Sequence, residues 1–210
     1  MAETFKNQVD ALTGFASTED DALSDWLTAG AIEIINQLPS NLKEKCMTFT
    51  NLTASAGTTR DMDGIGEIMH VSRKNADSGY YTSCRKISAM HSDLANDSGN
   101  IIHYATITDP VYYIESNGLD AATLFVKPTP TDAQPAKVYH ISYPAVTHGL
   151  ALIANFPDEA EYLVTLYAAI KATERLMLDQ EDQEVYAPQL GTLKQDYAQG
   201  LATLKGGQQG

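Results

Sequence analysis

The chain has 210 residues and a net charge of −13, from 14 basic and 27 acidic side chains. This charge argues against a protein that wraps nucleic acid, because binding along a phosphate backbone requires clustered lysine and arginine. No segment reaches the length of a membrane span, and the first ten residues lack the apolar core of a signal peptide. We therefore expect a soluble protein made in a cytoplasm, with Cys46 and Cys84 as reduced thiols or, alternatively, as one disulfide.

The N-terminal part predicts two helices. The first is short and ends near Gly14. The second spans residues 20–38, has Ser17 and Thr18 before it as candidate N-caps, and is stopped by Pro39. The apolar positions at helical spacing are Phe5, Val9, Leu12, Leu23, Trp26, Leu27, Ile34, Ile35 and Leu38.

From residue 45 to residue 146 the composition changes. Thr, Tyr, Ile and Val alternate with Gly, Asn, Asp and Pro, which is typical of strands and turns. We expect a hairpin turn at Asn117-Gly118, a helical turn within residues 88–94, and an extended loop over residues 127–135, which contain three prolines. The expected strands are residues 45–52, 67–74, 80–86, 103–108, 111–116, 122–127 and 137–143.

Residues 156–177 begin a second helical region. Pro157 suits the first turn of a helix, acidic residues follow it, and basic residues come late, which complements the helix dipole. After a polar break at residues 179–183, a second amphipathic segment spans about residues 184–204, and together they predict an antiparallel hairpin. The apolar positions are Leu163, Leu166, Tyr167, Ile170 and Met177, then Leu190, Leu193, Tyr197, Leu201 and Leu204.

These elements predict an α+β fold, in which an α-helical bundle formed by both chain ends carries an inserted antiparallel β-rich module. The expected divisions are residues 1–44 for the N-terminal helices, 45–147 for the β-rich insertion, 148–205 for the helical hairpin that completes the bundle, and 206–210 for a flexible tail.

The sequence contains none of the common catalytic, phosphate-binding or zinc-protease motifs. We therefore expect no enzyme, no cofactor, and no catalytic, cofactor-binding or metal-binding residues. Residues 61–66 resemble the start of a calcium loop, but Ile65 stands where an oxygen ligand is required and Ser72 where a glutamate is required, and a turn is predicted instead. In each of the pairs Tyr80-Tyr81 and Tyr112-Tyr113 we expect one buried and one surface residue.

Basic residues cluster only in the pairs Arg73-Lys74 and Arg85-Lys86. If both pairs lie in one sheet, they form a small patch that would face acidic groups of a partner. Two pairs do not suffice for tight binding to duplex DNA.

Three blocks carry a resemblance to a known family. They are DDALSDWLTAGAIEIINQLP, TLFVKPTPTDAQPAKVYHISYPAV and FPDEAEYLVTLYAAIKATERL. They resemble head-to-tail adaptor or connector (neck) proteins of tailed bacteriophages, whereas residues 53–100 match nothing recognisable. The resemblance implies a structural virion protein at the head-tail junction, in a homo-oligomeric ring of about twelve copies. Its partners would be the portal protein and tail or neck proteins, with DNA passing through the channel without specific binding and no membrane involved.

Within that resemblance, we expect the helical ends to build the ring and engage the portal, and the β-rich module to project toward the tail. Three alternatives stay open: a neck or tail component downstream of the adaptor, a host-recognition module that binds carbohydrate, and an unrecognised enzyme. The candidate portal-docking residues are Leu201, Leu204, Lys205 and Gly206. The candidate tail-docking loop residues are Thr129, Pro130, Thr131 and Asp132.

Overall fold

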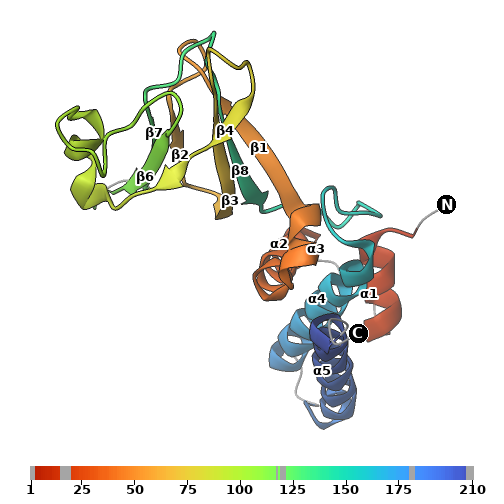
Figure 1. The fold of residues 1–210 in the computed structure, drawn as a ribbon. Coiled ribbons are helices and arrows are strands. Elements are labelled where there is room, and N and C mark those ends of the chain that lie inside the picture. The colour runs from red at the N-terminus through yellow and green to blue at the C-terminus, as the bar shows by residue number, and fades with distance from the viewer. Residues whose placement is uncertain (1–2, 15–19, 117, 119–121, 180–182, 207–210) are drawn as a thin grey trace. The chain divides into compact units, whose positions relative to one another are not determined.

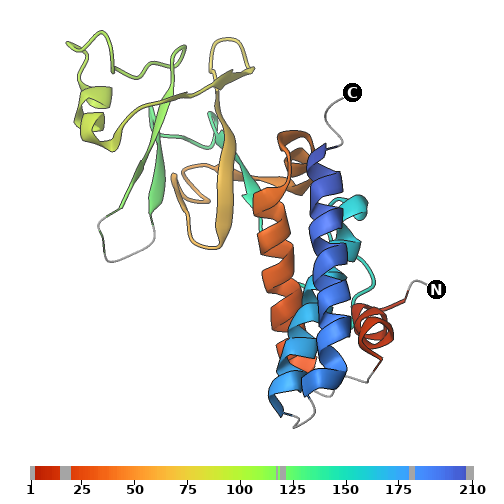
Figure 2. The ribbon, with the colours of Figure 1, turned by 90° about the horizontal axis from the view of Figure 1, so that it is seen from below.

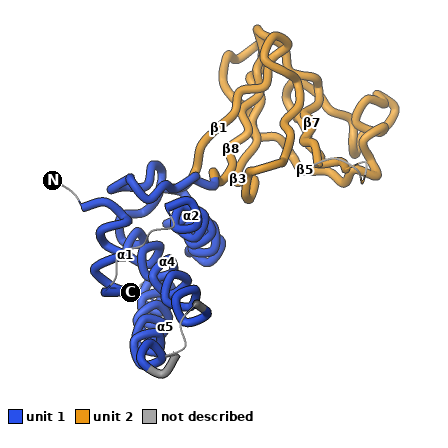
Figure 3. Tube along the Cα trace, turned by 180° about the vertical axis from the view of Figure 1, so that it is seen from behind, with its two compact units in different colours: residues 1–46, 143–210 blue, residues 47–142 orange. Residues whose placement is uncertain are grey.

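The computed structural model describes residues 3–14, 20–116, 118, 122–179 and 183–206. Within these residues the fold is mixed α+β, with five α-helices and two four-stranded sheets. Contacts divide the chain into two compact units, unit 1 with residues 1–46 and 143–210 and unit 2 with residues 47–142 (Figure 3). In the described part of the chain, no helix is both long and apolar enough to cross a membrane.

All five helices belong to unit 1 (Figure 1). The side chain of Thr4 caps the first helix, which ends at Gly14 with a φ of +74° that favours glycine. Pro39 follows the end of α2, as predicted, but it also precedes a short helix that was not predicted. The candidate caps Ser17 and Thr18 lie outside the described residues. The helices are α1 (Phe5–Thr13), α2 (Asp20–Gln37), α3 (Ser40–Lys43), α4 (Asp158–Asp179) and α5 (Gln183–Gly206).

Helix α4 packs against α1, α2 and α5, and Figure 2 shows α2, α4 and α5 side by side. The predicted apolar stripe of α4 is buried at Leu163, Leu166 and Ile170. Small side chains are buried as well, so burial extends well beyond one stripe. These are Ala160, Thr165, Ala168, Ala169, Ala172 and Thr173. Alanine and threonine carry little hydrophobic signal, so the periodicity of large residues predicts only part of this core.

Two glycines let helices approach α4 closely. A Cβ atom at Gly30 of α2 would lie 2.8 Å from Tyr167 Cδ1, and one at Gly200 of α5 would lie 2.4 Å from Leu163 Cδ2. Both distances are shorter than van der Waals contact, so any larger residue requires the packing to shift.

Helices α4 and α5 run antiparallel. Glu174, late in α4, accepts a hydrogen bond of 2.9 Å from Lys194 in the first half of α5, whereas Leu163, early in α4, lies against Gly200 near the end of α5. Of the predicted seam in α5, Leu193 is buried. The other members are half-buried: Leu190, Tyr197, Leu201 and Leu204. Residues 180–182, within the predicted polar break, lie outside the described residues.

Unit 2 contains both sheets (Figure 1). The first has the order β1 (Met47–Leu52), β8 (Ala136–Ser142), β3 (Ile65–Lys74) and β4 (Tyr81–Ser83). The second has the order β2 (Thr59–Asp61), β7 (Thr123–Lys127), β6 (Val111–Glu115) and β5 (Arg85–Lys86). All pairs are antiparallel except β5 with β6. This parallel pair corrects the expectation of an antiparallel module; residues 87–110 form the crossover connection that parallel pairing requires.

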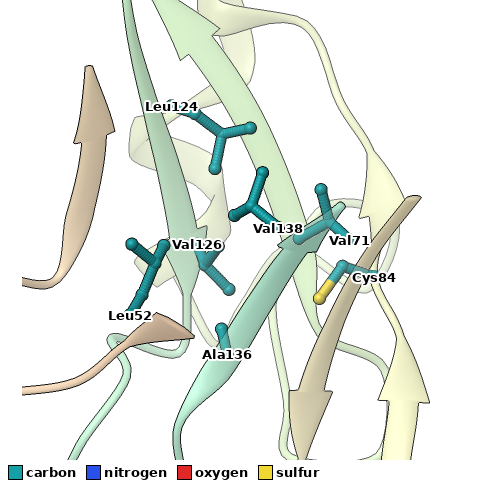
Figure 4. Close-up of a cluster of buried hydrophobic side chains, with 7 residues drawn as sticks. All are labelled: Leu52, Val71, Cys84, Leu124, Val126, Ala136 and Val138. Carbon is teal, nitrogen blue, oxygen red and sulfur yellow. The ribbon is translucent and has the colours of Figure 1, made fainter. Parts of the chain in front are cut away.

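Two apolar clusters give unit 2 its layers. Alternate residues of β6 and β7 point to opposite faces of the second sheet. Leu124 and Val126 belong to the core between the sheets (Figure 4), whereas Val111 and Tyr113 belong to a cluster under residues 87–105. The first core consists of Leu52, Val71, Cys84, Leu124, Val126, Ala136 and Val138. The second consists of Ile87, Ala95, Ala105, Val111 and Tyr113.

The strand predicted at residues 103–108 is wrong, since this segment contains turns and irregular backbone. Local side chains supply the hydrogen bonds that a ladder would provide: Asn100 Oδ1 accepts from His103 N, and Thr106 Oγ1 accepts from Asp109 N. The short strand β2 was not predicted, whereas the helical turn expected within residues 88–94 is confirmed by 3₁₀ turns at Ala89–His91 and Asp93–Asn96. Asn117 of the predicted hairpin turn lies outside the described residues.

Candidate functional site

The outward surface of the first sheet carries exposed aromatic and apolar side chains. Opposite residues of an antiparallel pair share a face, and the register places both Phe49 and His70 opposite Tyr139. Phe49 is 50% exposed and Tyr81 is 40% exposed, on the two edge strands of the sheet. We name this surface the aromatic face; its members are Met47, Phe49, His70, Tyr81, Lys137 and Tyr139.

An open groove of about 310 Å³ lies on the aromatic face, with Ser72 contributing to its lining. The Tyr139 ring organises one side of it, because its centroid lies 5.7 Å from that of Phe49 and 5.9 Å from that of His70. Such tilted ring pairs hold one another in place. The groove is therefore walled by rings supported on neighbouring strands.

Lys137 supplies the charge of the aromatic face. Its Nζ lies 5.0 Å from the ring centroid of Phe49 and 4.7 Å from that of Tyr81, so one ammonium is held between two rings. Among the described residues, no carboxylate forms an ion pair with Lys137. Lys74 shares this face, because it lies opposite Tyr81 in the ladder. The surface thus offers apolar rings around a positive charge to an incoming group.

A second exposed apolar surface lies on the crossover connection between β5 and β6. Met90, Ile101 and Ile102 are 90%, 95% and 72% exposed, respectively. The rings of His91 and His103 stack with centroids 4.3 Å apart, which links the 3₁₀ turn that contains Met90 to the turn that carries Ile101 and Ile102. We name Met90, Ile101 and Ile102 the apolar knob.

Side-chain hydrogen bonds fix the turn that carries Ile101 and Ile102 of the knob. Asn100 Oδ1 accepts hydrogen bonds from Ile102 N at 3.2 Å and His103 N at 3.0 Å. The Arg85 guanidinium donates to the Ile102 carbonyl at 3.1 Å and to Asp109 at 3.0 Å. The two isoleucines are thus presented to solvent on a defined turn.

The tyrosine pairs do not divide as predicted. Tyr80 and Tyr81 are both exposed, because Tyr80 precedes β4 and Tyr81 lies on β4 at the edge of the sheet. Tyr112 packs against the core between the sheets and Tyr113 belongs to the outer cluster, so both faces of β6 are covered.

Although His91 and His103 stack, no group of three or more His, Cys, Asp or Glu side chains within the described residues could hold a metal ion. Residues 61–66 include the predicted turn, in which Asp63 N donates to Asp61 Oδ1 and Gly64 has a φ of +66°. Both cysteines are free and buried. Burial raises the pKa of the Cys46 thiol to about 11 and that of the Cys84 thiol to about 12.

The candidate portal-docking residues lie in the last turns of α5. Leu201 and Leu204 are half-buried, whereas Lys205 and Gly206 are exposed. Helix α5 includes Gly206, the first residue of the expected tail, and the ammonium of Lys205 donates to Gln37 Oε1 of α2 at 2.9 Å. Residues 207–210 of the expected tail lie outside the described residues.

The candidate tail-docking residues lie between β7 and β8. Thr129, Thr131 and Asp132 are exposed, but Pro130 is buried. Asp132 Oδ1 accepts hydrogen bonds from the backbone and hydroxyl of Ser55 at 3.0 and 2.7 Å, and these bonds lower the pKa of Asp132. The segment is therefore a loop held by hydrogen bonds, with the side chains of Thr129, Thr131 and Asp132 exposed to solvent.

Arg73 holds the same loop from inside unit 2. Its side chain is 3% exposed, and burial lowers its pKa. The guanidinium donates to the Pro128 carbonyl at 2.8 Å, the Thr129 carbonyl at 3.4 Å and Gln134 Oε1 at 3.0 Å. The basic patch expected from Arg73-Lys74 and Arg85-Lys86 is thus wrong, because Arg73 is buried and the two pairs lie in different sheets.

The aromatic face and the apolar knob were missed by sequence reasoning. Met47 and Phe49 alternate in a strand with threonines, so the pattern does not say which face is buried. Ile101 and Ile102 of the knob follow Gly99 and Asn100, and isoleucines in such a turn-rich segment are the one signal that could have marked this surface.

The chain matches no protein-family model, and no curated protein is detectably similar to it.

Proposed function

We propose that the protein is a structural virion protein, a subunit of the ring between the portal and the tail of a tailed bacteriophage. The observation that carries the proposal is the division of the chain: its two ends fold together into one helical unit, and a β unit with its own core is inserted between them. This organisation agrees with the resemblance seen in the sequence blocks. In the proposal, unit 1 is an α-helical bundle centred on α4, which is supported by the packing of α1, α2 and α5 around that helix.

The charge distribution supports a channel-forming role without DNA binding. Unit 1 carries 17 acidic and 7 basic side chains, whereas unit 2 carries 10 and 7. An acidic surface beside DNA repels its phosphates, so DNA can slide past without being held. The role needs no catalytic residues and no cofactor.

The docking residues proposed within this function are exposed side chains at two places. Lys205 and Gly206 at the end of α5 would meet the portal, and the loop with Thr129, Thr131 and Asp132 would meet tail or neck proteins. Leu201 and Leu204 are half-buried against unit 1, so truncating α5 would damage packing as well as docking. Point substitutions such as Lys205→Glu and Thr129→Lys test docking more cleanly, whereas a change at Asp132 would also remove the bonds from Ser55 that hold the loop.

Electron microscopy of the purified protein, with and without portal rings, tests the proposal. We expect rings that stack coaxially on the portal. A monomer with no affinity for portal would contradict the proposal, and binding of random duplex DNA at physiological salt would contradict its DNA-repelling part.

A second candidate is a host-recognition module that binds carbohydrate, and the aromatic face favours it because sugars stack on exposed rings. Lys137, however, lies over both Phe49 and Tyr81, so the ring faces turned toward it are not open to a sugar. This candidate predicts a trimer and saturable binding to a glycan, which Tyr139→Ala would abolish.

A further inference from the structure

We propose that unit 2 carries both halves of a head-to-tail contact between copies of this chain, in which the apolar knob of one copy enters the groove of the aromatic face of the next. The inference deepens the proposed ring and rests on it for its biological setting. It names the second copy as the occupant of both surfaces, because three properties of the knob and the groove are complementary.

The first property is position. The aromatic face is the outward surface of the first sheet, and the core that contains Val71 and Val138 lies behind it. Beyond that core comes the second sheet, then the cluster that contains Val111 and Tyr113, and then the segment that carries the knob. The knob and the groove are therefore separated by both sheets and cannot meet within one copy.

The second property is chemistry. The knob offers three large apolar side chains, and the groove is walled by Met47, Tyr81 and Tyr139. Around three-quarters or more of each knob side chain is exposed, so insertion would remove much apolar surface from water.

The third property is charge. Asp93 and Asp97 are exposed on the segment that bears the knob, and Arg85, which contacts the Ile102 carbonyl, is already paired with Asp109. Lys137 and Lys74 lie on the aromatic face, and no carboxylate among the described residues forms an ion pair with either. Opposite charges at the rim of an apolar contact fix its orientation and disfavour contact between like surfaces.

Preorganisation lowers the cost of such a contact. The hydrogen bonds of Asn100 and Arg85 already hold the turn with Ile101 and Ile102, and strands hold the rings. Little conformational freedom is then lost on association. Because the two surfaces differ, the contact is heterologous, and repeating it generates a closed ring or an open filament.

Disulfide trapping between two variants, each with one introduced cysteine, tests the contact. Ile101→Cys places a thiol on the knob and Met47→Cys places one at the groove, while the native cysteines are buried. Under mild oxidation, a mixture of the two variants should form a covalent dimer about tenfold faster than either variant alone, because binding raises the local thiol concentration. Leu178→Cys, on an exposed residue of α4, is the matched control when mixed with Met47→Cys.

A complementary pair of assembly-defective variants adds a second readout. Ile102→Asp and Tyr139→Asp should each fail to assemble, but their mixture should give dimers, because one intact knob still meets one intact groove. Circular dichroism of each variant checks that it folds.

The outcomes separate this inference from the proposed function. If portal-bound rings form, yet the mixed thiols react no faster than the control and Ile102→Asp assembles normally, the inference fails and the ring subunit stands. If trapping is specific but no ring forms on portal, the contact stands and the proposed function fails. Faster trapping of Ile101→Cys alone would mean that knobs meet knobs, which overturns the inference.

Discussion

Unit 1 and unit 2 bury their apolar side chains in different ways. Unit 1 surrounds one central helix, α4, and uses alanine, threonine and glycine to bring other helices close to it. Unit 2 stacks two small sheets and a loop segment into thin layers, which leaves large apolar residues on both outer surfaces. Of the twelve most exposed large apolar residues in the described part of the chain, seven lie in unit 2. The comparison places the close helix packing in unit 1 and most of the exposed large apolar residues in unit 2.

The largest expected effect tests the central position of α4. Leu166 is 1% exposed, so Leu166→Ala should lower the free energy of unfolding by about 2–5 kcal/mol through lost burial and a cavity. Ile170→Ala should behave in the same way, whereas Leu178→Ala, at a residue 75% exposed, should cost little. Thermal and urea unfolding measure the difference. If both core variants leave stability unchanged, the helix packing described for unit 1 is wrong.

The next effect tests close packing with a pair of glycines. Gly30→Ala forces a Cβ to within 2.8 Å of the Tyr167 ring and should destabilise unit 1 by about 1–3 kcal/mol. Gly191→Ala in α5 is the control, because nothing lies within 4 Å of its Cβ position. That variant should stabilise by about 0.5–1 kcal/mol through helix propensity. Equal effects in chemical denaturation would contradict a close approach of α2 to α4.

A comparable change in unit 2 tests how Arg73 holds the loop after β7. Arg73→Met keeps much of the buried volume but leaves acceptors at residues 128, 129 and 134 without their donor, which should cost about 1–3 kcal/mol. Hydrogen exchange should rise in residues 128–135 and stay unchanged in α4. Arg73→Lys should rescue only in part, because an ammonium lacks the planar fork of a guanidinium. Unchanged exchange in the loop would show that other contacts hold it.

The smallest effect concerns pH. Burial, and secondarily Arg60, lower the pKa of His140 below its ordinary value of 6.5, and the ring contacts Thr50 Oγ1 and the Ile141 carbonyl. As pH falls, His140 is protonated in the unfolded state before it is protonated in the folded state. The contribution of neutral His140 to the stability of unit 2 is therefore complete above its ordinary pKa, and it declines as pH falls toward the lower pKa of the folded state. His140→Gln should flatten this decline between about pH 7 and pH 5. A variant whose pH dependence equals that of the parent would exclude His140 as its source.

The sequence predicts the elements of unit 1 better than those of unit 2. Long amphipathic segments with acidic starts and a proline stop define α2 and α4, because a helix is specified by contacts close in sequence. In unit 2, strands β2 and β5 have three residues or fewer, and their pairing depends on residues far along the chain. Local turns override strand propensity at residues 103–108. The aromatic face and the knob depend on which sheet surface stays uncovered, and alternation alone does not specify that.

Native mass measurement of the protein bound to purified portal rings tests the central claim most directly. The account predicts that each portal ring binds one fixed number of copies of this protein, equal to the number of portal subunits. This is expected for a ring that has the same rotational symmetry as the portal. A trimer that ignores portal, or a monomer at every concentration, would contradict the assignment as a ring subunit of the head-tail junction.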